Sequence, residues 1–344
     1  MALREYDLFG NLHDKVARAV EIAKSFCPPE GYYLAYSGGK DSTVVKAVLD
    51  MAGVKYDAYY NVTTVDPPEL VRFIISQFDA VVYEMPDGSQ KYYKVKPQGT
   101  KLLHRVDKSD IEGGRTIYFT IPAIPMRKLI VKRLFPPTQT IRYCCEVLKE
   151  TNGEGRAVVT GVRWAESVNR KKNQGVAVIW TSREKNVKSV ADGNNARYTQ
   201  NNRNSIILNY DDAAARRTVE MCYRTNRTLV NPIIDFDEDD VWEFIKEYNL
   251  PYCGLYDEGY KRLGCVGCPM RRGEGMRRDF ERWPHIRMMY EQAFDEMLKE
   301  RDRRGLETRI GKNGNEILDW WTGLFDTNRK NELDQISIEE LMEG

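Results

Sequence analysis

The chain has 344 residues, of which 30% are charged, and its formal net charge is +1. This length fits one enlarged domain or two domains, and so balanced a charge does not by itself indicate a nucleic-acid or membrane partner. No apolar run approaches the ~20 residues of a membrane-spanning helix. The charged N-terminus lacks the apolar region of a signal peptide, so we expect a cytoplasmic protein with no membrane partner.

Strands and helices are predicted to alternate in the first part of the chain. Apolar residues at helical spacing predict a helix over residues 11–26, and Pro28 and Pro29 end it. Alternation of strands with helices is typical of a parallel α/β sheet. Further strands are expected at 31–37, 54–63 and 80–86, with helices at 41–53 and 68–78 between them.

Two polar stretches interrupt this alternation. Residues 87–115 are interpreted as an insertion, and residues 181–227 as an excursion or lid. We therefore expect one domain over 1–270 that contains both insertions, followed by a basic helical region over 271–344. The remaining predicted elements are helices at 124–135 and 337–344, strands at 157–164 and 203–210, and a strand followed by a helix within 229–250.

The segment SGGKDS, residues 37–42, follows directly after the predicted strand at 31–37. Glycines let the backbone turn tightly, and the amides and dipole at the start of the next helix favour an anion. Lys40 adds a full positive charge, so the pattern indicates a phosphate-binding loop. A turn capped by Asp41 is the plainer alternative. The residues that we expect to bind a nucleotide here are Ser37, Gly38, Gly39, Lys40, Asp41 and Ser42.

A second motif, TGVRWAESVNR, spans residues 160–170. Gly161 lies at a predicted strand end, where the backbone can approach a ligand. The guanidinium groups of Arg163 and Arg170 have the planar geometry that suits phosphate or sulfate. The alternative is an ordinary strand end with solvated arginines.

These motifs resemble the PP-loop ATP pyrophosphatase superfamily. SGGKDS is similar to its PP-loop, and residues 160–170 and 231–270 are similar to motifs of its phosphoadenosine phosphosulfate (PAPS) reductase-like and DndC-like branch. The resemblance implies a Rossmann-like fold of the adenine nucleotide alpha hydrolase type, with a parallel five-stranded sheet. It also implies that ATP is cleaved between its α- and β-phosphates, with Mg²⁺ present, and that Asp66 recognises adenosine or Mg²⁺.

The cysteines fall into two pairs and three single residues. Disulfides are rare in the cytosol, so the grouping of the seven cysteines matters more than their number. The pattern resembles the [4Fe–4S] ligands of adenylylsulfate reductases, while zinc or unmetallated thiols are the alternatives. The metal ligands that the resemblance implies are Cys144, Cys145, Cys265 and Cys268.

Sulfonucleotide reductases carry a nucleophilic cysteine in a C-terminal motif, and no cysteine follows Cys268 in this sequence. We therefore expect an enzyme that adenylates an acceptor for sulfur transfer. In this interpretation Lys40 and Asp41 act at the phosphates, Arg163 holds the substrate and Glu166 positions it. A sulfonucleotide reductase with a relocated nucleophile and a non-catalytic nucleotide-binding subunit of a defence or modification system are the alternatives.

The expected partners follow from the same resemblance. The acceptor is expected to be a nucleic acid, and a sulfur-donor protein such as a cysteine desulfurase and a homo-oligomer are further expectations. Arginines alternate with aromatic residues over 270–290, which suits a phosphate backbone and stacked bases. A solvated helix face with acidic partners is the alternative interpretation of this segment.

Overall fold

The computed structural model describes residues 3–6, 12–96, 102–149, 153–180, 184–201, 205–224, 226–271 and 273–323, with the side chains of 184–187 left undescribed. The short helix predicted at 337–344 lies outside these ranges. Within them, no helix combines the length and the apolar character that crossing a membrane requires.

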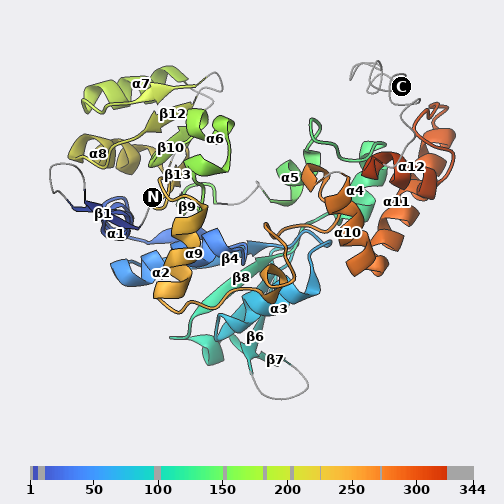
Figure 1. Ribbon diagram of the computed structural model, residues 1–344, viewed down its shortest axis with the longest axis horizontal. Coiled ribbons are helices and arrows are strands. Elements are labelled where there is room, and N and C mark those ends of the chain that lie inside the picture. Colours follow the sequence, from blue (N-terminus) through green and yellow to red (C-terminus); the bar gives the residue numbers. More distant parts are fainter. Residues whose placement is uncertain are drawn as a thin grey trace.

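One mixed sheet of eleven strands organises the described chain, in the order β11-β12-β10-β13-β9-β3-β4-β8-β5-β6-β7 (Figure 1). Its centre is parallel and both of its flanks are antiparallel. The parallel strands are β13 (Arg227–Val230), β9 (Ala157–Val159), β3 (Tyr32–Ala35), β4 (Tyr56–Asn61), β8 (Thr116–Thr120) and β5 (Ala80–Glu84). The antiparallel strands are β11 (Thr199–Gln200), β12 (Ser205–Leu208), β10 (Ala177–Trp180), β6 (Gln90–Val95) and β7 (Leu103–Val106).

The predicted α/β class is confirmed, but the sheet is larger than the five strands expected. Six strands are parallel, because β8 joins the centre of the sheet between β4 and β5. Both polar stretches extend the sheet: β6 and β7 come from the first, and β11 and β12 from the second. The edge strands β7 and β11 face water on more of their surface than central strands do, so they tolerate polar residues. The strand β12, with the sequence SIIL, is instead fully buried.

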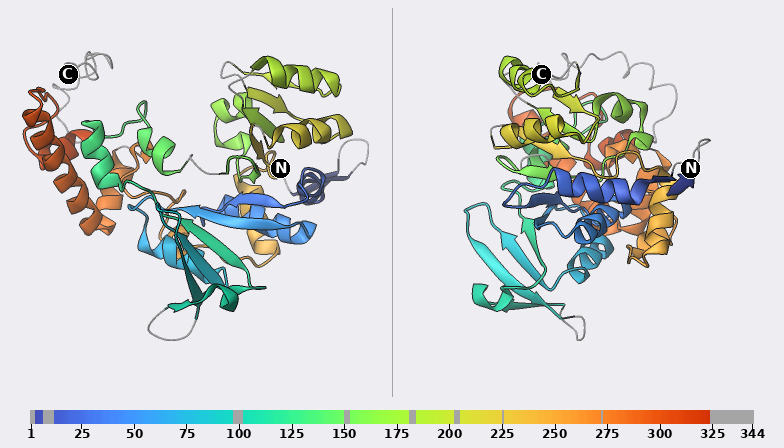
Figure 2. Two further views of the ribbon diagram at one scale, coloured as in Figure 1. Left: turned by 180° about the vertical axis from the view of Figure 1, so that it is seen from behind. Right: turned by 90° about the vertical axis from the view of Figure 1, so that its left-hand side faces the viewer.

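Helices cover one face of this sheet. The buried residues of α1 (Lys15–Ser25), α2 (Lys40–Ala52), α3 (Pro68–Ser76) and α8 (Ala213–Cys222) join the main core together with inward side chains of the central strands. The helix α9 (Glu238–Glu247) packs on α2. In the right-hand view of Figure 2, the blue helices α1 to α3 stand on one side of the cyan strands.

The opposite face of the sheet carries its own small cluster. Tyr33, Val158 and Leu229 are buried there, apart from the main core, and Tyr59 and Trp180 pack against them. Parallel sheets are usually covered on both faces. On this face, three aromatic side chains, namely Tyr33, Tyr59 and Trp180, belong to the small cluster.

A second helical region lies at the right-hand end of the molecule in Figure 1, away from β10 and β12. There α11 (Pro284–Arg303) packs against α4 (Met126–Arg133) and α12 (Gly314–Thr322), and α10 (Glu274–Arg282) lies beside it. The short elements are the hairpin β1 (Arg4–Tyr6) and β2 (Leu12–Asp14), α5 (Tyr143–Leu148), α6 (Val168–Asn173), α7 (Glu184–Gly193), η1 (Lys108–Ile111), η2 (Trp164–Glu166), η3 (Gly254–Tyr256) and η4 (Pro269–Arg271).

Candidate functional site

The glycine loop leaves the carboxyl end of β3 and starts α2, with Gly39 as the residue that caps the helix. The Ser42 Oγ donates to the Gly39 carbonyl at 2.9 Å, and the Ser37 Oγ donates to the Ser42 Oγ at 3.3 Å. The backbone N–H of Lys40 donates to the Tyr256 hydroxyl at 2.9 Å. The loop is therefore held by its own serines and by a tyrosine more than two hundred residues away in the sequence.

Gly38 cannot carry a side chain in this loop. Its φ is +70°, and an added Cβ would lie 2.4 Å from the Ile74 Cγ1 atom of α3. Gly53 offers a matched comparison, because its φ is +65° and a Cβ there would meet nothing within 4 Å. The two glycines thus share a left-handed backbone and differ in their surroundings.

We expect Gly38→Ala to destabilise the fold more than Gly53→Ala does. Both substitutions incur the left-handed penalty of ~1 kcal/mol, and overpacking adds a further ~1–3 kcal/mol only at Gly38. Urea unfolding of both variants measures the difference. Equal losses of unfolding free energy would show that α3 does not press on the loop as described.

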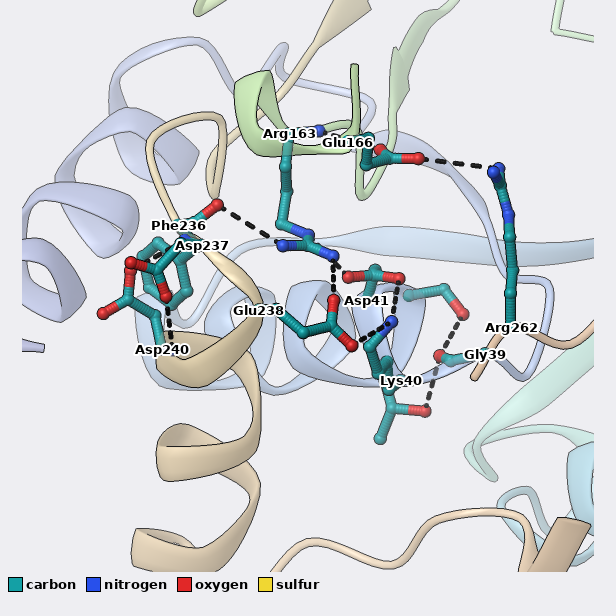
Figure 3. Close-up of polar contacts among 12 residues, drawn as sticks. Gly39, Lys40, Asp41, Arg163, Glu166, Phe236, Asp237, Glu238, Asp240 and Arg262 are labelled. Carbon is teal, nitrogen blue, oxygen red and sulfur yellow. Dashed lines mark hydrogen bonds and ion pairs between the residues drawn. The ribbon is translucent and has the colours of Figure 1, made fainter. Parts of the chain in front are cut away.

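Four charged side chains form a closed network in front of the loop (Figure 3). The Lys40 Nζ lies 3.3 Å from Asp41 Oδ2 and 3.3 Å from Glu238 Oε1. The Arg163 Nε lies 2.7 Å from Asp41 Oδ1, and its Nη2 lies 2.8 Å from Glu238 Oε2. Lys40 and Arg163 are almost fully buried, so two cations and two carboxylates compensate one another at the base of the site.

Glu166 ties the second motif together. The Arg163 backbone N–H donates to Glu166 Oε1 at 3.1 Å, and Glu166 Oε2 lies 3.6 Å from Arg170 and 3.5 Å from Arg262 (Figure 3). Gly161 packs so closely on Asp41 that an added Cβ would lie 2.9 Å from the Asp41 carbonyl carbon. The 160–170 segment therefore lies against the start of α2.

A cleft of about 720 Å³ opens over this network. Trp242, Tyr252 and Tyr256 form an aromatic wall, with the Trp242 ring centroid 5.4 Å from that of Tyr252 and 5.1 Å from that of Tyr256. The volume lies within the ~300–1,000 Å³ of small-molecule sites. Of the predicted site residues, Lys40, Asp41, Arg163 and Glu166 line the cleft.

Glu238 is a site residue that sequence reasoning missed. It begins α9 in the acidic run DEDD, a pattern that is also typical of an ordinary helix start. Burial acts to raise the pKa of Glu238, but Arg163 and Lys40 outweigh burial and hold that pKa below its ordinary value. The sequence did contain a signal for this role, because Glu238 is a carboxylate at the start of a helix that lies near the cationic loop.

The lowered pKa of Glu238 predicts a pH-dependent stability. The ionised carboxylate stabilises the fold fully above its unfolded pKa of ~4.3, and this contribution is lost as the pH falls through the lower folded value. We expect wild type to unfold at a higher temperature than Glu238→Gln at neutral pH, and the gap to close at acidic pH. Thermal scans against pH test this, with Glu243→Gln, exposed on the same helix, as the control. A gap that is the same at every pH contradicts it.

Asp66 does not line the cleft around Lys40. Its carboxylate accepts from the Thr63 N–H at 2.8 Å and from the Thr63 Oγ1 at 2.6 Å, which closes a turn after β4. The residue that caps α3 is Pro67. Asp66 instead lies near the ammonium of Lys149 and the Cys265 thiol.

The two cysteine pairs come into one neighbourhood. A hydrogen bond to Cys145 and burial raise the pKa of Cys144, and the charges of Cys265 and Cys268 raise it further. The same bond, followed by Arg142, lowers the pKa of Cys145 to about 5. The negative charge of Cys265 raises the pKa of Lys149, so a cation lies beside the thiols.

The four thiols were predicted to be the ligands of an iron–sulfur cluster. Among the described residues, no three His, Cys, Asp or Glu side chains are grouped so that they could hold a metal ion. A cubane binds one thiolate at each iron, so its ligands are spread more widely than those of a single ion. The chemistry of the donor set fits such a cluster, and the assignment of Cys144, Cys145, Cys265 and Cys268 as ligands remains a prediction.

The helical region fixes the Cys265–Cys268 turn. Buried Asp279 accepts from the Gly267 N–H at 3.0 Å and pairs with Arg271 at 3.0 Å, while Arg271 donates to the Cys265 carbonyl at 2.8 Å. The Tyr290 hydroxyl donates to the Val266 carbonyl at 3.2 Å. This turn is therefore positioned by α10 and α11.

The arginines of 270–290 largely serve the fold. Arg278 donates to the Glu258 and Gly259 carbonyls and lies over the Tyr260 ring, 4.3 Å from its centroid. Arg282 pairs with Glu69 and Glu258, each at 3.0 Å. Trp283 and Tyr290 are 2% and 1% exposed, so the two aromatics expected to stack bases are instead part of the core.

Comparisons with known proteins match parts of this chain. Residues 123–271 match the family model of the phosphoadenosine phosphosulfate reductase domain. The adenosine 5'-phosphosulfate reductase of Oceanobacillus iheyensis is 43% identical over 54 residues, which are 16% of this chain and 22% of that protein. The corresponding reductase of Neisseria meningitidis serogroup A is 45% identical over 49 residues, which are 14% of this chain and 20% of that protein. The chain thus spans about a fifth of the length of the curated relatives it matches.

The similarity to solved structures is distant. The phosphoadenylyl-sulfate reductase of Candida auris, in a phosphate complex, aligns with 72% of this chain and 87% of its own, with a TM-score of 0.36 and 13% identity. The FMN adenylyltransferase of Candida glabrata aligns with 73% of this chain and 65% of its own, with a TM-score of 0.35 and 14% identity. Neither likeness carries an argument about function.

Proposed function

Because the chain belongs to the PAPS reductase-like superfamily of PP-loop proteins, we propose that it is an ATP-dependent enzyme that adenylates an acceptor for sulfur transfer. The observation that carries the proposal is that two buried cations, Lys40 and Arg163, lie together at the floor of a cleft beside the glycine loop. A loop with helix amides, a lysine and an arginine is suited to polyphosphate.

In the proposed reaction, an acceptor oxygen attacks the α-phosphorus of ATP. The bond from that phosphorus to the oxygen that bridges to the β-phosphorus breaks, and pyrophosphate leaves with the electron pair. Lys40 and Arg163 stabilise the charge that develops on the phosphates. Asp41 and Glu238 hold both cations in place and offer carboxylate oxygens of the kind that Mg²⁺ prefers.

In the second step, hydrosulfide, released from a donor persulfide by a thiol reductant, attacks the acceptor atom that bears the adenylated oxygen. The bond from that atom to that oxygen breaks, and AMP leaves with the electron pair. A [4Fe–4S] cluster, which Cys144, Cys145, Cys265 and Cys268 would hold, supplies a binding site for the incoming sulfur when it is bound. Lys149, beside these thiols, is placed to balance thiolate charge. We propose a nucleic acid as the acceptor and a sulfur-donor protein, such as a cysteine desulfurase, as the source.

The test is an anaerobic incubation of the protein with ATP, Mg²⁺, sodium sulfide as the sulfur source and a mixed transfer-RNA or DNA preparation. Pyrophosphate and AMP formed in equal amounts, only with the acceptor present, support the proposal. Tight ATP binding with no turnover against either nucleic acid contradicts it and favours a nucleotide-binding subunit.

A sulfonucleotide reductase is the second candidate, and the identity of the curated relatives favours it. Adenylyl sulfate or its 3'-phosphorylated form would be incubated with the protein and reduced thioredoxin. Release of sulfite without any need for ATP would support reduction in place of adenylation.

A further inference from the structure

Three tyrosines are stacked on the face of the sheet opposite the main helices. The ring centroids of Tyr33 and Tyr59 are 4.0 Å apart with planes 6° apart, and those of Tyr59 and Tyr118 are 4.9 Å apart with planes 21° apart. The order of β3, β4 and β8, with Tyr59 directly opposite Tyr118, produces this stack. Among the described rings, none continues it beyond Tyr118.

A cavity of about 860 Å³ lies along this stack. Tyr59 and Tyr118 are half-buried and line it, together with Tyr92 of β6. The cavity shares no lining residue with the cleft over Lys40. Its volume lies within the range of small-molecule sites. It is therefore a second concave site, separate from the proposed nucleotide site.

Polar groups suited to hydrogen bonding lie around the aromatic surface. The Gln90 amide nitrogen donates to Glu84 Oε1 at 3.2 Å, and its amide oxygen accepts from the Tyr92 hydroxyl at 2.8 Å. Thr116 also lines the cavity. An amide, a carboxylate and a hydroxyl beside a stacking surface can read the donors and acceptors of a heterocyclic ring edge.

The charges around this cavity nearly cancel. Asp57 pairs with Arg156 at 2.7 Å, Glu30 with Arg224 at 3.8 Å, and Arg115 with Asp79 at 3.0 Å. The remaining charged residues among those that line it are Lys55, Lys108, Glu84 and Glu112. Such a balance favours a neutral planar ring in the cavity over a compact polyanion.

We propose that this cavity binds a nucleobase, packed against the Tyr118 ring where it lines the cavity and hydrogen-bonded by Gln90 and its neighbours. Aromatic side chains stack on any base because every base has a π-face. The base belongs either to a free nucleoside or to an unpaired stretch of a nucleic-acid strand. This site goes beyond the proposed function and does not depend on ATP turnover.

The test is calorimetric titration of the full chain with adenosine, guanosine, cytidine and thymidine, in which dependence of the binding on Tyr118 distinguishes this cavity from the cleft over Lys40. We expect at least one nucleoside to bind, and Tyr118→Leu to weaken that binding about fivefold or more, the lower end of base–aromatic stacking. Tyr118→Phe keeps the ring and should bind like wild type. Tyr6→Leu, at a 74% exposed tyrosine elsewhere, controls for the substitution type.

Gln90→Ala gives an independent readout, because Gln90 is exposed and its replacement should leave the fold intact. It should weaken the preferred nucleoside and change the preference among the four. A single-stranded oligonucleotide that binds more tightly than its own nucleoside identifies a strand as the source, whereas equal or weaker binding identifies the free nucleoside. The proposal is overturned if no nucleoside or oligonucleotide binds, or if Tyr118→Leu and Tyr118→Phe behave alike.

Discussion

Replacing Lys40 with methionine is expected to lower the rate of pyrophosphate release from ATP at least ~100-fold, which corresponds to about 2.7 kcal/mol of transition-state stabilisation. Lys40 is 4% exposed and lies at the floor of the cleft, where a positive charge is screened little by water. Methionine keeps most of the side-chain volume and removes only the charge. Coupled detection of pyrophosphate, with the acceptor present, measures the rate.

The matched control is Lys46→Met on the same helix. Lys46 pairs with Asp50 one turn away at 2.8 Å and does not line the cleft. We expect its rate to stay within about twofold of wild type, because such a helix pair contributes only ~0.3–0.5 kcal/mol to stability and nothing to the site. Wild-type turnover by Lys40→Met would remove the glycine loop from the proposed chemistry.

The second large effect is expected for Cys265→Ala. If four thiolates hold a cubane, the loss of one should reduce the iron of anaerobically purified protein from about four atoms per chain to well below half of that. The broad visible absorbance of the cluster should fall in parallel. Both readouts are independent of activity, so they test the cluster separately from sulfur transfer.

Cys27→Ala provides the comparison for this experiment. Cys27 lies beyond the end of α1, where its thiol donates to the Pro28 carbonyl at 3.5 Å. Its loss should leave iron content and absorbance unchanged. Equal iron in wild type and Cys265→Ala, with both proteins folded by circular dichroism, would rule Cys265 out as a ligand.

The parts of the fold that could be predicted are those where local pattern and final environment agree. The segment that became β3 and α2 combines a buried apolar run, two glycines and a regular helix. The strand β8 went unpredicted because TIYFT adjoins a polar stretch that looked like a continuous insertion. The strand β6, QKYYKV, is polar because it lies near a sheet edge, where the sequence pattern does not reveal the pairing partner.

The candidate site was predictable where one geometric rule applied. Strands that run parallel bring their carboxyl ends to one edge, so the Lys40 loop and the Arg163 segment had to meet. Glu238 was missed because its role depends on how α9 is oriented. The position of Asp66 near Lys149, away from the cleft over Lys40, could not be predicted either, because it depends on the turn after β4. The arginines after Met270 could not be classified without knowing which carboxylates and carbonyls reach them.

The bond from the Lys40 amide to the Tyr256 hydroxyl has a mechanical consequence. Only eight residues lie between Tyr256 and Cys265, and the Val266 N–H donates to the Val65 carbonyl at 2.9 Å. A single short segment thus connects the glycine loop to the Cys265–Cys268 turn. A triphosphate that displaces the Tyr256 hydroxyl from the Lys40 amide would break this link. Nucleotide binding at the loop would then increase the mobility of the segment that carries Cys265.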